Sequence, residues 1–270
     1  MTERCLLHRF DPTIASVYGI TAALIYQYIT FRSARTHGRF VAVTLADLEE
    51  LYPYIGRWQL WAGLRKLTHP GKKTPALLHR QSRGGGYVYA PVATENNDAV
   101  LHSFDAQLAT RIGVVPAIIY GNISHWIRSN WQEQAEKCYA YLDPARFDYD
   151  DGALQHYAYQ HTRLAAAHQI NVPDWVKLRP YLSLRTAERG FSLLCEHKLL
   201  TRNRINLRRT VWRWTASSEQ NYLDKLLNKN TLGDSSAKTK HCPPKPNARR
   251  QNQTRFSYKR LRDRYLRDRA

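Results

Sequence analysis

The chain has 270 residues, of which 43% are hydrophobic, so it is long enough for one or two domains with cores of their own. The 41 Lys and Arg residues exceed the 22 Asp and Glu residues and give a formal net charge of +19. No apolar run approaches the ~18 residues of a membrane span, no secretory signal is recognisable, and the four cysteines are scattered. We therefore expect a cytoplasmic protein whose charge favours nucleic acid over an anionic lipid surface or a merely well-solvated basic surface.

An internal repeat organises the sequence. Residues 10–31 return as residues 104–125 with eight identities, at an offset of 94. In each copy an Asp (Asp11, Asp105) precedes a short helical segment, and a glycine (Gly19, Gly113) is placed to end it. A second helix is then expected to start near Thr21 in the first copy and at Pro116 in the second.

The repeat continues downstream at a different offset. Residues 53–67 match residues 180–194 at an offset of 127, so the second copy contains about 33 additional residues between Trp131 and Ile170. This insertion near 131–170 includes an acidic run at 148–151 and a predicted helix over 152–167. We predict a first domain over residues 1–98 and a second domain over residues 99–217.

In each copy the pattern then predicts two short helices joined by a turn. Thr44 begins the first of these with a capping-box pattern, and Pro53 forces a turn before a helix over about 57–67. In the second copy Ser183 is the expected N-cap of a helix over 184–197. This spacing is typical of a helix-turn-helix.

Each of these helix pairs is followed by an alternating segment that predicts a β-hairpin. In the first copy the arms are 76–81 and 87–90 around a glycine-rich turn, and in the second they are 199–207 and 211–215. A helix-turn-helix followed by a hairpin is the winged-helix arrangement. The expected fold class is therefore mainly α with small β-hairpins (α+β), as two tandem winged helix-turn-helix domains.

The motif FDxxxAxxxG, the PY(I/L) turn with the helix after it, and the hairpin together resemble the winged-helix domains of phage and plasmid replication proteins. Those proteins include replisome organisers and replication initiators of mobile elements. The resemblance covers about residues 10–90 and 104–215, and this chain departs from the commoner single-domain form by its second copy and its insertion. It implies binding of duplex DNA in replication, whereas the residues alone leave transcriptional regulation open.

In such a fold the second helix of each pair enters the major groove. Periodicity places Ala187, Phe191 and Leu194 in the core and leaves Arg185, Thr186, Arg189 and Ser192 outward. Arginine commonly binds guanine with two hydrogen bonds, so Arg185 and Arg189 are the best candidates for reading bases. The alternative is a solvated helix face with ion pairs to Glu188 or Glu196.

The first copy offers a different set of outward residues on its second helix. Besides Trp58 and Trp61, the candidate DNA-binding residues there are Arg57, Gln59, Arg65 and Lys66. The two tryptophans suit packing against the sugar backbone and a protein–protein surface equally well. Phosphate contacts are expected from the hairpins, at Arg80 and Arg83 in the first copy and at Arg202, Arg204, Arg208 and Arg209 in the second, with protection of an edge strand as the alternative.

The C-terminal residues differ in composition from the rest of the chain. Residues 231–270 contain twelve Lys and Arg against three Asp. This charge, with the proline cluster at 243–246, predicts a basic, largely disordered tail over residues 218–270. The tail would bind phosphates non-specifically or dock a replisome or host protein.

The sequence contains no nucleotide-binding glycine loop and no metalloprotease motif, so we expect neither an enzyme nor a cofactor. His156, His161 and His168 fit no standard metal spacing, and the acidic run at 148–151 is better explained as a solvated loop, so we expect no metal. The leading hypothesis is a sequence-specific binder of duplex DNA from a mobile element. The alternative from another class is an adaptor or inhibitor that binds a host or replisome protein.

Overall fold

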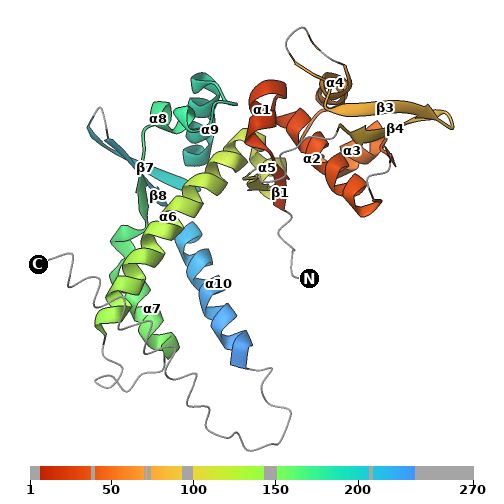
Figure 1. Cartoon of the computed structure of the whole chain (residues 1–270). Helices are drawn as coiled ribbons and strands as arrows, with labels where there is room; N and C mark the ends of the chain where they lie inside the picture. The colour runs from red at the N-terminus through yellow and green to blue at the C-terminus, as the bar shows by residue number, and fades with distance from the viewer. Residues whose placement is uncertain are drawn as a thin grey trace, which may run out of the picture. The chain divides into compact units, whose positions relative to one another are not determined.

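The computed structural model describes residues 7–37, 40–69, 71, 74–92, 100–142, 151–206 and 209–234. These residues are 61% helical with small antiparallel sheets, so the α+β class expected from the sequence is confirmed (Figure 1). Within the described ranges, no helix has both the length and the apolar character needed to cross a membrane.

The chain divides into two compact units, each built from two separate stretches of sequence. The first unit comprises residues 1–125 and 169–212, and the second comprises residues 126–168 and 213–270. Both copies of the repeat therefore contribute to the first unit. The insertion and the residues after the last hairpin form the second.

The first copy of the repeat begins with strand β1 (Leu7–Phe10), followed by helices α1 (Pro12–Tyr18) and α2 (Ile20–Arg35). The Asp11 carboxylate accepts hydrogen bonds from the backbone N–H groups of Thr13 and Ile14 at the start of α1, as expected of an N-cap. Gly19 ends α1 with a φ of 91°, a backbone conformation that favours glycine. Helix α2 follows immediately, one residue earlier than the sequence indicated.

The same copy continues with strand β2 (Val41–Ala42), helices α3 (Leu45–Leu51) and α4 (Arg57–Thr68), and strands β3 (Leu78–Arg83) and β4 (Gly86–Pro91). The capping box at Thr44 and Asp47 is present. Strand β4 pairs antiparallel with both β2 and β3, and Arg83 pairs with Gly86 across a two-residue turn. Strand β2 was not expected, because two residues are too few to show an alternating pattern.

The second copy contains strand β5 (His102–Asp105) and helices α5 (Ala106–Ile112), α6 (Val114–Tyr141), α8 (Val172–Lys177) and α9 (Leu184–Glu196). Its sheet has the order β6-β8-β7, formed by β6 (Ala167–Gln169), β7 (Leu200–Asn206) and β8 (Arg209–Trp214). Asp105 caps α5, Gly113 ends it with a φ of 94°, and Ser183 caps α9, all as expected. Helix α6 starts two residues before the proline at which the sequence placed it.

The core of each copy includes a close approach between two helices at a glycine. A Cβ atom added to Gly63 of α4 would lie 3.1 Å from Thr21 Cγ2 and 3.2 Å from Ile25 Cδ1 of α2. The residues Leu60, Leu64 and Leu67 are buried, as their spacing predicted. Helix α4 therefore packs directly on α2 with its apolar face.

Gly190 of α9 occupies the matching place in the second copy. Its added Cβ atom would lie 2.6 Å from Ile119 Cδ1 and 3.2 Å from Val115 Cγ1 of α6. The residues Ala187, Phe191 and Leu194 are buried, again as predicted. Ile119 and Val115 stand at the repeat positions of Ile25 and Thr21, so the two copies share one packing geometry.

Strands β1 and β5 join the two copies within the first unit. They pair antiparallel, with His8 opposite Phe104 and Phe10 opposite His102. Phe10 and Phe104 are both fully buried, at 0% and 1% exposure, and lie in one hydrophobic core cluster. This pairing brings residues of both copies into one core within the first unit.

The second unit has an aromatic core. Trp131 is fully buried and makes ring contacts with Tyr159, Trp214 and Tyr222, and its indole N–H donates to the Tyr159 carbonyl at 3.0 Å. Helix α7 (Asp151–His161) is shorter than the predicted helix over 152–167 because the short helix η1 (Arg163–Ala165) and strand β6 follow it.

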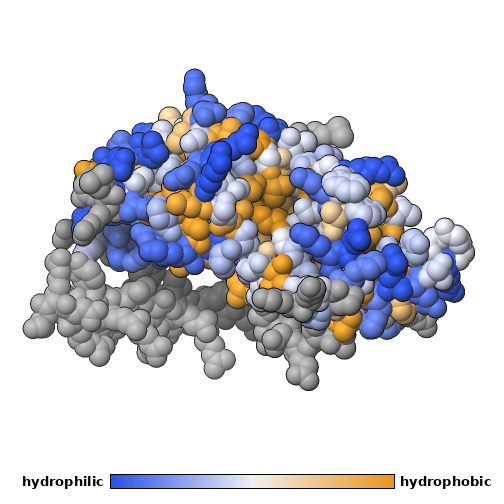
Figure 2. Space-filling model, turned by 90° about the horizontal axis from the view of Figure 1, so that it is seen from above, coloured by the Kyte–Doolittle hydropathy of each residue, from blue (hydrophilic) through white to orange (hydrophobic). Residues whose placement is uncertain are grey.

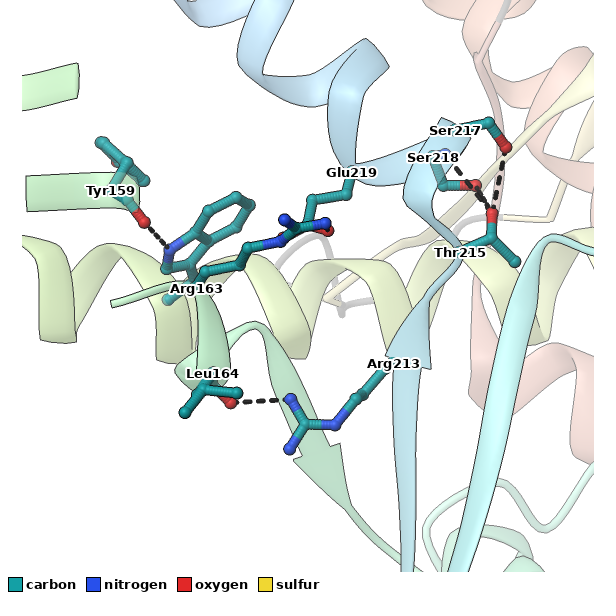
Figure 3. A network of polar contacts seen from close by, with 9 residues as sticks. Tyr159, Arg163, Leu164, Arg213, Thr215, Ser217, Ser218 and Glu219 are labelled. Atoms are coloured by element: carbon teal, nitrogen blue, oxygen red, sulfur yellow. Dashed lines mark hydrogen bonds and ion pairs between the residues drawn. The ribbon is translucent and has the colours of Figure 1, made fainter. Parts of the chain in front are cut away.

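A polar network holds helix α10 (Ala216–Asp234) against the short helix η1 in this unit (Figure 3). Arg163 binds the Glu219 carboxylate through Nε at 2.9 Å and through a terminal nitrogen at 2.8 Å. Helix α10 therefore occupies the start of the segment assigned to the tail, where Leu223 is buried and Tyr222 contacts the Trp131 ring. The remainder of the expected tail, residues 235–270, lies outside the described residues.

Candidate nucleic-acid interface

Helix α4 presents the candidate residues of the first copy on its exposed side. Arg57, Gln59, Arg65 and Lys66 are all exposed. Two of them are engaged locally: Arg57 forms an ion pair with Glu49 of α3 at 3.1 Å, and Lys66 Nζ donates to the Tyr18 carbonyl at 3.3 Å. Among these four residues, neither Arg57 nor Lys66 is free of a local polar partner.

The two tryptophans of α4 form a stack on the same helix. The Trp58 and Trp61 rings lie 4.7 Å apart at an interplanar angle of 23°, and the Arg65 guanidinium lies over the Trp61 ring at 5.3 Å. Trp58 is 73% exposed. An exposed indole stacked on a half-buried one beside a cation offers a flat aromatic surface for a ligand with its own π face or apolar surface.

Helix α9 presents a different surface in the second copy. Arg185, Thr186 and Arg189 are exposed, while Thr186 Oγ1 is hydrogen-bonded to Ser183 Oγ at 2.8 Å. The ion pairs considered for the two arginines, with Glu188 or Glu196, are absent from the described part of the chain. Both guanidinium groups are thus placed on the exposed side of a helix whose opposite side is buried.

The hairpins add further exposed arginines. In the first copy the Arg80 guanidinium lies over the Tyr87 ring at 4.7 Å, and Arg83 is exposed beside the turn. In the second copy Arg202, Arg204 and Arg209 are exposed, and Arg208 lies outside the described residues. Figure 2 shows that hydrophilic residues cover much of the visible face around smaller exposed apolar areas.

Two equivalent histidine–tyrosine pairs lie at the contact between β1 and β5. His8 Nδ1 is hydrogen-bonded to the Tyr54 hydroxyl, and His102 Nδ1 is hydrogen-bonded to the Tyr181 hydroxyl at 2.9 Å. Tyr54 and Tyr181 lie in the turns just before α4 and α9. The pairs therefore connect the start of each exposed helix to the strand that joins the copies.

Burial sets the protonation of these pairs. Burial lowers the pKa of His8, and burial together with the nearby Arg179 charge lowers the pKa of His102 to about 4. Burial also raises the pKa of Tyr54 and of Tyr181. At neutral pH both histidines are therefore neutral, and each pair is an uncharged hydrogen bond.

These four residues were not among the candidates from the sequence. A signal for them was present, because His8 and His102 are identical at the offset of 94 and Tyr54 and Tyr181 at the offset of 127. The histidines of the insertion make ring contacts: His161 contacts Tyr157, and His168 contacts Trp126 at 4.6 Å. Among the described residues, no three His, Cys, Asp or Glu side chains gather in a way that would hold a metal ion.

Comparison of the chain with protein-family models, with curated proteins and with solved structures gave no match.

Proposed function

We propose that the chain binds specific sequences in duplex DNA through two winged helix-turn-helix modules, one in each copy of the repeat. The observation that carries this proposal is the second copy: α9 buries Ala187, Phe191 and Leu194 and exposes Arg185 and Arg189 on its other side, directly before a hairpin with exposed arginines. Arginines on such a helix suit hydrogen bonding to guanine, and those on the hairpin suit phosphates.

The net charge of +19 supports the same partner, since binding of phosphates by Lys and Arg releases condensed counterions. The resemblance to replication proteins of phages and plasmids favours initiation or organisation of replication in a mobile element, acting in the cytoplasm without catalysis. Regulation of transcription would use the same binding mode.

The test is selection of bound duplexes from a random pool at about 150 mM salt, a concentration that weakens purely electrostatic binding. The wild-type chain is compared with an Arg185→Ala/Arg189→Ala variant. We expect a defined motif for the wild type, and loss or relaxation of part of that motif for the variant, at about 1–3 kcal/mol for each base that is no longer bound.

A matched control is Arg202→Ala/Arg204→Ala, which removes two exposed arginines from the hairpin. This control should weaken binding to all duplexes without changing the motif, because phosphate contacts carry no sequence information. Equal binding of every duplex by the wild type and by both variants would refute specific base reading.

The Trp58–Trp61 stack favours a second candidate function, that of an adaptor that binds a replisome or host protein. A tryptophan that is 73% exposed is unusual on a helix that reads bases and frequent at the centre of protein interfaces. In that case replacement of Arg185 and Arg189 would leave the biological activity intact. Trp58→Ala would abolish it without loss of folding.

A further inference from the structure

The two copies of the repeat are related by a local twofold axis at the β1–β5 contact. In the register, His8 lies opposite Phe104, Arg9 opposite Ser103 and Phe10 opposite His102. When each residue is replaced by its counterpart in the other copy, 94 positions away, the His8–Phe104 pair becomes the His102–Phe10 pair. The Arg9–Ser103 pair becomes itself. Such a register is that of a symmetric antiparallel contact with its axis between Arg9 and Ser103.

The side chains follow the same symmetry. Phe10 contacts the Tyr181 ring of the other copy at 5.5 Å, and Phe104 contacts the Tyr54 ring of the other copy at 5.9 Å. The His8–Phe104 and Phe10–His102 ring contacts are likewise matched, at 6.1 and 5.8 Å with interplanar angles of 81° and 80°. The contact is thus self-complementary, as it is between the subunits of a symmetric dimer.

The same twofold axis relates the exposed helices α4 and α9. Helix α4 approaches α2 at Gly63 through Thr21, Ala22 and Ile25, with the Ala22 nitrogen 3.3 Å from the added Cβ atom. Helix α9 approaches α6 at Gly190 through the equivalent residues Val115, Pro116 and Ile119. Helix α4 packs on α2 at the same position as helix α9 packs on α6. The axis that relates the two copies therefore also relates α4 to α9.

The chemistry of the two exposed helices differs at equivalent positions. Trp58 of α4 corresponds to Arg185 of α9, Gln59 to Thr186 and Ala62 to Arg189. Indole, amide and methyl groups on one helix thus replace two guanidinium groups and a hydroxyl on the other. The two helices cannot favour the same bases.

We propose that one copy of this chain binds a single duplex at two unlike half-sites in inverted orientation and at a fixed spacing. This inference rests on the proposed function and specifies its substrate. The twofold relation of α4 and α9 sets the inverted orientation, since the symmetry of a DNA site mirrors that of the protein. The difference between Trp58 and Arg185 makes the halves unlike, and the β1–β5 contact fixes the spacing.

The experiment converts α4 into a copy of α9 on its exposed side. The variant Arg57→Leu/Trp58→Arg/Gln59→Thr/Trp61→Glu/Ala62→Arg gives positions 57–62 of α4 the outward residues that α9 has at positions 184–189. Duplex selection with the wild type should return two different half-sites. Duplex selection with the variant should return the α9 half-site twice, as an inverted repeat. Insertion of 5 base pairs between the two half-sites should weaken binding about tenfold or more, because it turns one half-site to the opposite side of the duplex.

A direct repeat, a single half-site, or tolerance of the inserted base pairs would overturn the inference while leaving DNA binding intact. Absence of any motif for the wild type would instead refute the proposed function. These two failures are therefore distinguishable.

If the variant misfolds or keeps the wild-type motif, a second experiment determines the orientation of α4 and α9 on the wild-type DNA site. A DNA-cleaving reagent is attached to a single cysteine introduced on one of these helices. The cysteines are placed at positions 59 and 65 of α4 and at the equivalent positions 186 and 192 of α9, in a chain whose four native cysteines are serine. Inverted half-sites are supported if the cleavage positions from the two cysteines of α4 run along the duplex in the opposite order to those from the two cysteines of α9. The same order for both helices overturns the inference of inverted half-sites.

Discussion

Gly63 holds the close contact between α4 and α2, where a side chain would meet Thr21, Ile25 and the backbone nitrogen of Ala22. Thr21 is β-branched and the Ala22 nitrogen belongs to a helix, so neither can move away easily. We expect Gly63→Val to lower the free energy of unfolding by about 2 kcal/mol through overpacking.

The matched control is Ala62→Val, which places the same β-branched side chain at the neighbouring, half-buried position of α4. It should lower stability by only about 0.5 kcal/mol, its helix-propensity cost. Urea denaturation followed by circular dichroism measures both, and equal losses would show that Gly63 is not a packing residue.

The two histidines of the β1–β5 contact make stability depend on pH. Burial lowers the folded-state pKa of His8, and burial with the Arg179 charge lowers that of His102 to about 4, while Asp11 opposes the shift of His102. Unfolded histidine titrates near 6.5. The unfolded chain therefore takes up protons first, and the stabilisation present above pH 6.5 should be lost as the pH falls towards 4.

The measurement is urea denaturation at pH 7.5 and at pH 5. The double variant His8→Gln/His102→Gln should lose less stability than the wild type between these values, because glutamine does not titrate. His197→Gln, at an exposed position, should lose as much as the wild type. A double variant with the full wild-type loss would exclude these histidines as the cause.

Among the elements, the β3–β4 hairpin depends on its two-residue turn. Gly84 and Gly85 have φ values of 57° and 81°, so both central residues lie in the left-handed region, as in a type I′ turn. We expect Gly84→Val to lower stability by about 1–2 kcal/mol, because a β-branched residue is strained there. Gly84→Asn should be nearly neutral, because asparagine tolerates this conformation.

The control for this prediction is Gly86→Val, at a position that begins β4 without a positive φ and where an added Cβ atom makes only an ordinary van der Waals contact, 3.9 Å from the Arg83 carbonyl oxygen. Amide hydrogen exchange of the β4 residues reports the hairpin directly. Fast exchange in Gly84→Val only is the expected result, and fast exchange in Gly86→Val as well would point to the strand rather than the turn.

The elements that the sequence predicted well are those whose causes are local. The Asp11 and Ser183 caps, the Thr44 capping box, and the breaks at Gly19 and Gly113 depend on neighbouring backbone groups, and all are present. Strands β1, β2, β5 and β6 have only two to four residues, too few to show a period, and their partners are distant in sequence. Local reasoning therefore placed the arginines of α9 on its exposed side but did not find the His8–Tyr54 and His102–Tyr181 pairs.

At the scale of the whole molecule, the repeat predicted two copies but not how they are joined. The buried side chains Phe10 and Phe104 belong to one core that both copies share. Trp131 lies in the core of the other unit, which contains the insertion and the residues after β8. Hydrophobicity identified these side chains as core residues, but it carries no information about which core they share. In this chain the strand that precedes each copy pairs with the strand that precedes the other, as between the subunits of a symmetric dimer.

The charge of the molecule is unevenly distributed along the chain, and this gives a last prediction about the proposed DNA binding. Residues 235–270 hold twelve Lys and Arg against two Asp, so they carry +10 of the net +19. Removal of these residues should weaken binding to every duplex and reduce the slope of log affinity against log salt by about 0.9 for each phosphate that is no longer neutralised. The selected motif should stay the same, since base contacts are expected from α4 and α9.

The measurement is a salt titration of binding to the selected site and to an unrelated duplex, with the full chain and with a chain that ends at Asp234. The matched control replaces residues 235–270 by a neutral Gly/Ser segment of equal length, which keeps the chain length and removes the charge. Parallel slopes for the full and shortened chains would show that this charge does not contact phosphates. The steep salt dependence would then have to come from the arginines of the hairpins.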